Sequence, residues 1–142
     1  MTWVTACSTV PEESHETYSF PKQAFVGIPK LPFKALGSVK TRVNYSTLTS
    51  LTEGDDLCQN YYHKAVQQLL DLAKQNGGDA VIQVRSVVFH MDGSSQSYKT
   101  AECFDNGAEG QVLTRGIAIR WKNPKQINSL ETQVPMVQAA PE

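Results

Sequence analysis

Between residues 57 and 76 the apolar side chains recur at the spacing of one face of an α-helix. They are Tyr62, Ala65, Val66, Leu69, Leu70 and Ala73. Upstream, Thr52-x-x-Asp55 matches a capping box, which favours the start of a helix. Gly77-Gly78 follows the stripe, and glycine often ends a helix because it enters the left-handed conformation without a steric penalty. The pattern therefore predicts one amphipathic helix.

Three other stretches, 33–44, 80–91 and 111–121, are rich in β-branched residues or alternate apolar and polar ones, which is typical of strands. Residues 92–95, Asp-Gly-Ser-Ser, predict a turn, after which residues 98–104 can return as an antiparallel partner. The resulting order is β-α-β-β-β. We therefore expect an α+β fold, in which a single amphipathic helix packs on a small, mostly antiparallel sheet.

Both ends of the chain differ in composition from its middle. Residues 1–32 contain four prolines among Ser, Thr and Glu, and we expect them to form an extended tether that lies on the domain near Phe25. Residues 123–142 are rich in Gln, Pro and Ala and lack the periodicity of a packed element, which predicts a flexible tail. The folded domain should span residues 33–122.

Composition and charge exclude several classes of function. The 142 residues are 40% hydrophobic and 19% charged, as in an ordinary globular domain. The net charge of -1 provides no basic field for nucleic acid. No run of eighteen apolar residues suggests a membrane span. Three strand arginines are expected to face solvent: Arg85, Arg115 and Arg120.

Two of the three cysteines lie within the predicted domain. Cys58 is four residues before Tyr62, so its thiol points from the helix towards the sheet, and Cys103 lies in the strand-like stretch 98–104. Cys58 could be a small buried hydrophobe or one half of a disulfide with Cys103. The sequence leaves both open, because it does not show the distance between them.

The third cysteine, Cys7, bears on the cellular compartment. Residues 4–7, Val-Thr-Ala-Cys, fit the lipobox pattern of an aliphatic residue, two small residues and the cysteine that receives lipid. A proline-rich polar stretch follows, as expected for a lipoprotein tether. Residues 1–3 are no signal peptide, so we expect the start of the precursor to lie upstream. An oxidising envelope compartment favours the disulfide over the free thiol.

No residue set predicts catalysis or metal binding. His63 follows Cys58 by five positions, which turns it away from the same helix face, and His15 and His90 lie far from it in sequence. The chain has no Cys-x-x-Cys or His-x-x-x-His spacing. The neighbours of Cys103 include no base that would activate a thiol. We therefore expect a protein that is not an enzyme and needs no metal or other cofactor.

The domain resembles the YbjQ/RcsF-like superfamily of small β-α-β-β modules over residues 33–122. The residues that carry the resemblance are Gly37-Ser38-Val39, Cys58, Ala65 to Ile82 with its Gly-Gly-Asp-Ala-Val motif, Glu102-Cys103 and Gly116-Ile117-Ala118. It is most similar to short cysteine-paired envelope proteins that are sometimes mislabelled as excinuclease ATPase subunits. That label does not fit, because the chain has no Gly-x-x-x-x-Gly-Lys-Ser/Thr loop to hold phosphates.

The two branches of the superfamily imply different functions. The RcsF branch implies an outer-membrane lipoprotein that faces the periplasm and signals envelope stress to a protein partner, with Cys58 and Cys103 matching one of its two bridges. The second bridge has no counterpart here, because residues 84–86 and 111–113 contain no cysteine. The YbjQ branch implies a cytosolic oligomeric ring that binds a small ligand or metal. We favour the first, with a lipid anchor at Cys7, and retain the second as the alternative.

Overall fold

Asp56 begins the helix α1 (Leu57–Gln75): its carboxylate accepts hydrogen bonds from the backbone N–H groups of Cys58 and Gln59. Of the computed structural model, residues 16–48 and 56–123 are described. The predicted capping-box residues Thr52 and Asp55 lie outside them, and the cap is Asp56. The helix ends where the N–H of Gly78 donates to the carbonyl oxygen of Ala73. The predicted helix is confirmed to within one residue.

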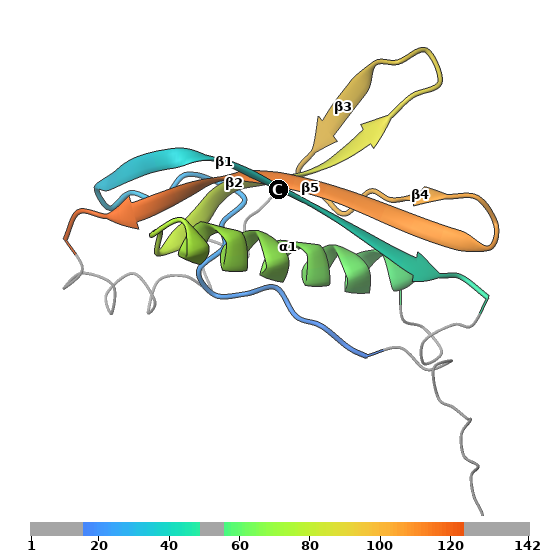
Figure 1. Ribbon diagram of the computed structural model, residues 1–142, viewed down its shortest axis with the longest axis horizontal. Coiled ribbons are helices and arrows are strands. Elements are labelled where there is room, and N and C mark those ends of the chain that lie inside the picture. The colour runs from blue at the N-terminus through green and yellow to red at the C-terminus, as the bar shows by residue number, and fades with distance from the viewer. Residues whose placement is uncertain (1–15, 49–55, 124–142) are drawn as a thin grey trace, which may run out of the picture.

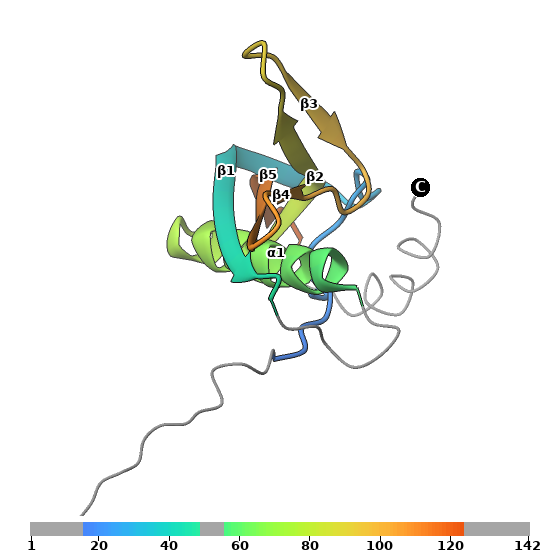
Figure 2. The same ribbon diagram turned by 90° about the vertical axis from the view of Figure 1, so that its right-hand side faces the viewer.

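The described residues form a sheet of five antiparallel strands. They are β1 (Phe33–Ser46), β2 (Ala80–Phe89), β3 (Ser95–Tyr98), β4 (Phe104–Asp105) and β5 (Glu109–Trp121). Their order is β1-β5-β2-β3, with the short β4 also paired to β5. Helix α1 lies across one face of this sheet, whereas the hairpin of β2 and β3 rises on the opposite side (Figures 1 and 2). The predicted α+β fold is confirmed.

The third strand differs from the prediction. We expected it at residues 98–104, but β3 begins at Ser95, which pairs with Phe89. The turn between them is tight, because the N–H of His90 donates to Ser94 and the carboxylate of Asp92 accepts from the Ser94 N–H and hydroxyl. Pairing therefore starts directly after the turn, and Cys103 lies outside every strand.

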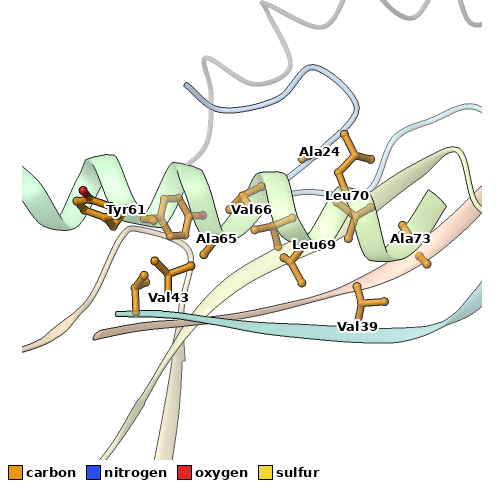
Figure 3. Close-up of a cluster of buried hydrophobic side chains, with 14 of the residues drawn as sticks. Ala24, Val39, Val43, Tyr61, Ala65, Val66, Leu69, Leu70 and Ala73 are labelled. Carbon is orange, nitrogen blue, oxygen red and sulfur yellow. The ribbon is translucent and has the colours of Figure 1, made fainter. Parts of the chain in front are cut away.

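The main core lies between α1 and the sheet. All six apolar residues of the predicted helix stripe are buried there. They pack against strand residues such as Val39, Val43 and Val112 (Figure 3). Gly116 of β5 makes room for the side chain of Val81 on β2, since a Cβ at this position would lie only 2.6 Å from Val81 but at an ordinary contact distance of 3.7 Å from Leu69 of the helix.

The N-terminal segment completes the fold. Residues 23–27 run beside the first half of β2: the N–H of Phe25 donates to Val81 at 2.9 Å, and the N–H of Val81 donates to Gln23 at 3.0 Å. Ala24 joins the main core, whereas Phe25 packs on the other face of the sheet with Ile82, Ile119 and Trp121. The segment that we expected to lie near Phe25 is thus part of the core, and the packed unit begins before the predicted boundary at residue 33.

Candidate functional site

A disulfide joins Cys58 and Cys103, whose Cα atoms are 5.8 Å apart. This separation lies within the usual range for bridged cysteines. The two alternatives that the sequence left open are thereby resolved in favour of the bridge. Cys103 also packs against the main core, although it lies outside the strands. The bridge connects the first turn of α1 to the segment between β3 and β4.

That segment is also held from the sheet side. The hydroxyl of Ser86, a buried residue of β2, donates to the carbonyl oxygen of Thr100 at 2.7 Å and accepts from the N–H of Glu102 at 3.2 Å. Ser86 therefore orients the residues directly before Cys103. The covalent bridge and these two hydrogen bonds fix the same short segment from opposite sides.

The lipidation prediction at Cys7 lies outside the described residues, as does His15. Within the described part of the chain, no helix has the length and apolar character needed to cross a membrane.

The two described histidines differ in their surroundings. His63 lies within hydrogen-bond distance of the Tyr18 carbonyl oxygen through Nδ1 and of the Gln59 side chain through Nε2. His90 is exposed at the turn before β3. Residues 16–48 and 56–123 contain no group of three or more His, Cys, Asp or Glu side chains that could hold a metal ion.

Helix α1 covers only one face of the sheet, and part of the other face forms an open groove. Among the described residues, the N-terminal segment covers this second face around Ile119 and Trp121. The groove has a volume of about 940 Å³. Its lining residues come from four strands: Lys40, Thr41, Arg42, Val87, Phe89, Ser95, Ser97, Leu113, Thr114 and Arg115. These lining residues include three cations and no carboxylate.

Strand register places like charges opposite one another in this region. Lys40 of β1 is directly opposite Arg115 of β5, and Arg115 is directly opposite Arg85 of β2. Directly opposed residues of neighbouring strands point to the same face of the sheet. Three cationic residues therefore form a row across three adjacent strands, and we call Lys40, Arg85 and Arg115 the cation row.

The arginines differ in their surroundings. Arg115 and Arg120 are exposed, as predicted. The prediction for Arg85 is wrong: this side chain is half-buried and donates to the carbonyl oxygens of Val26 at 2.7 Å and Val84 at 2.8 Å. Arg85 is drawn inwards because the N-terminal segment lies against β2 and presents a carbonyl oxygen to it. Sequence reasoning could not anticipate this contact without the placement of that segment.

The groove was not predicted either. The alternation of Val39, Lys40, Thr41, Arg42 and Val43 indicates that β1 has a cationic face, which is a usable local signal. The meeting of that face with Arg115 depends on strand register.

A scan against models of known protein families, a search of curated proteins and a search of solved structures each found no match.

Proposed function

We propose that this chain is a periplasm-facing envelope lipoprotein domain, anchored to the outer membrane through lipid on Cys7. In this proposal it acts without catalysis, as a binding or envelope-stress signalling module. The observation that carries the proposal is the bridge between Cys58 and Cys103. Disulfides persist mainly in oxidising compartments such as the bacterial periplasm.

The bridge also supports a role other than thiol chemistry. A cysteine nucleophile or metal ligand acts as a thiolate, and a sulfur held in a disulfide is not one. Cys58 and Cys103 therefore serve to hold the fold together while the domain presents its surfaces. An open sheet face on a domain that is held together by a disulfide is a suitable arrangement for a binding module.

The alternative is a cytosolic ring of the YbjQ kind, assembled by the pairing of sheet edges. The long edge strand β1 is the edge such a ring would use. It carries the exposed cations Lys34, Lys40 and Arg42, and charged edge strands resist pairing with other chains. The other edge of β2 is already occupied by residues 23–27 and by β3. These features favour the first proposal.

The test is the intact mass of the chain under denaturing, non-reducing conditions. The gene would be expressed with its upstream region in a Gram-negative host, beside a Cys7→Ala variant as the matched control. We expect a mature chain that starts at Cys7, carries added acyl mass and lacks two hydrogens at the Cys58–Cys103 pair. The control should lose the acyl mass and keep the bridge. An unprocessed chain with three free thiols would contradict the proposal, and its native mass would then test for a ring.

A further inference from the structure

We propose that the groove on the open sheet face, which is lined by Lys40 and Arg115 of the cation row, binds an acidic segment of a partner protein that also carries a bulky apolar side chain. This inference rests on the proposed binding role and identifies the surface and the chemistry of the partner. Two observations support it: strand register aligns cations on this face of the sheet, and apolar side chains line the same groove.

The charge arrangement is unfavourable for the isolated fold. Neighbouring strands lie about 4.8 Å apart, so directly opposed cations repel each other at close range. Arg115 has such a neighbour on both sides, Lys40 and Arg85. The Arg115 guanidinium donates a hydrogen bond to the neutral hydroxyl of Ser97 at 2.8 Å. Carboxylates from another molecule would convert this repulsion into attraction.

Apolar side chains line the same groove. Val87, Leu113 and Phe89 lie among the cations, and Phe89 is 54% exposed. An exposed aromatic side chain beside cations matches an occupant that has both carboxylates and an apolar anchor. A groove of about 940 Å³ also exceeds what a small inorganic anion would fill.

The shape favours a protein segment over a membrane surface. The hairpin of β2 and β3 rises from the sheet on this side (Figure 2). Residues of this hairpin line the groove and form one wall of it. Phe89 and Ser95, which pair across this hairpin, both line it. A narrow acidic segment can reach Lys40 and Arg115 beside that wall, whereas the wall holds a flat lipid surface away from them.

The experiment measures binding of a fluorescent probe to the purified full chain by anisotropy. The probe is a twelve-residue peptide in which glutamates alternate with leucine and phenylalanine, and its control has glutamine in place of each glutamate. We expect the acidic peptide to bind, the glutamine peptide not to bind, and salt to weaken the complex.

Two charge reversals on the same strand test the site. Lys40→Glu removes a cation from the groove, and we expect this variant to bind the acidic peptide about tenfold more weakly or worse. Lys34→Glu is the matched control: Lys34 is also exposed on β1 and opposite an arginine, Arg120, but it does not line the groove. We expect this control to change the affinity less than about twofold. Urea unfolding of both variants checks that the fold is retained.

Equal losses in the two variants, or no binding of the acidic peptide, would overturn the proposal. Capture of anionic phospholipid vesicles through Lys40 in the absence of peptide binding would overturn it too, in favour of a lipid surface. The mass measurement on Cys7 and the bridge is independent of these results. A lipidated, oxidised chain that ignores the peptide would thus refute this inference and leave the proposed function standing.

Discussion

The rings of Tyr45 and Tyr61 are stacked, with centroids 4.6 Å apart and an interplanar angle of 4°. Tyr45 belongs to β1 and Tyr61 to α1, so the stack joins the sheet to the helix. The ring centroid of Tyr18, in the N-terminal segment, is 5.8 Å from that of Tyr61, and the ammonium of Lys64 is 5.3 Å from the Tyr18 ring centroid. The Tyr45 ring also lies against Gly110 of β5, its directly opposed residue in the sheet. Four segments of the chain therefore meet at this stack.

Gly110→Ala should destabilise the protein by about 2 kcal/mol, as expected when a methyl group is forced into a packed core. The added Cβ would overlap the Tyr45 ring, and this ring cannot shift without disturbing its stacking on Tyr61. Urea unfolding followed by circular dichroism measures the loss. Gly27→Ala is the matched control, because its Cβ would meet nothing within 4 Å. Equal stability of the two variants would contradict the packing described here.

Removal of the bridge should lower the free energy of unfolding by about 4 kcal/mol in the chain-entropy model, because the bridge closes a loop with a sequence separation of 45. The comparison is between the wild-type chain and the double variant Cys58→Ala/Cys103→Ala in urea unfolding without reductant. Reductant should weaken the wild type and leave the double variant unchanged. Cys7→Ser serves as the control that keeps the bridge. A similar loss of stability in this variant would argue that the effect does not come from the Cys58–Cys103 bridge.

Lys40→Glu should raise the free energy of unfolding by about 0.5 kcal/mol, since it replaces a like-charge pair with Arg115 by an opposite-charge pair. High salt should reduce this gain by screening. Thermal unfolding at low and high salt measures both effects. Lys22→Glu, an exposed charge reversal outside the strands, is the control. A destabilised Lys40→Glu variant at low salt would show that the cation row is not a source of repulsion.

Tyr62 gives the protein an alkaline pH dependence. Burial raises the pKa of its hydroxyl to about 12, against the smaller opposing effect of Arg85. Between the ordinary value near 10 and this folded value, the unfolded chain has released the proton and the folded chain still holds it. Ionisation of Tyr62 therefore leaves the free energy of unfolding unchanged below pH 10 and lowers it as the pH rises to 12, by about 3 kcal/mol in total.

Tyr62→Phe should remove this part of the pH dependence. Since the buried Tyr62 hydroxyl has no hydrogen-bond partner among the described residues, the variant should also be about 1 kcal/mol more stable at neutral pH. Urea unfolding between pH 8 and pH 11 in a Cys7→Ser background, which removes the third thiol, compares the two chains. A residual slope is expected from Tyr45, whose pKa is also raised by burial. If the free energy of unfolding depended on pH identically in both chains, the pH dependence could not be assigned to Tyr62.

The elements that depend on residues close together in the sequence were predictable. The helix followed from the spacing of Tyr62 to Ala73 and from Gly77-Gly78, because a periodic apolar stripe is a local signal. The strands β1, β2 and β5 followed in the same way. The position of β3 did not, because Ser95 joins the pairing through the hydrogen bonds of the turn at Asp92 and Ser94, and several registers fit the same polar sequence.

The sequence alone determined the helix, the long strands, the α+β class and the presence of two cysteines that could pair, since each is written in short-range patterns. Tertiary structure decided the rest. It brought Cys58 to within bridging distance of Cys103, placed Phe25 in the core, turned Arg85 towards Val26 and aligned Lys40 with Arg115. These relationships join residues far apart in the chain. They depend on strand order and register, which follow from how the whole core packs.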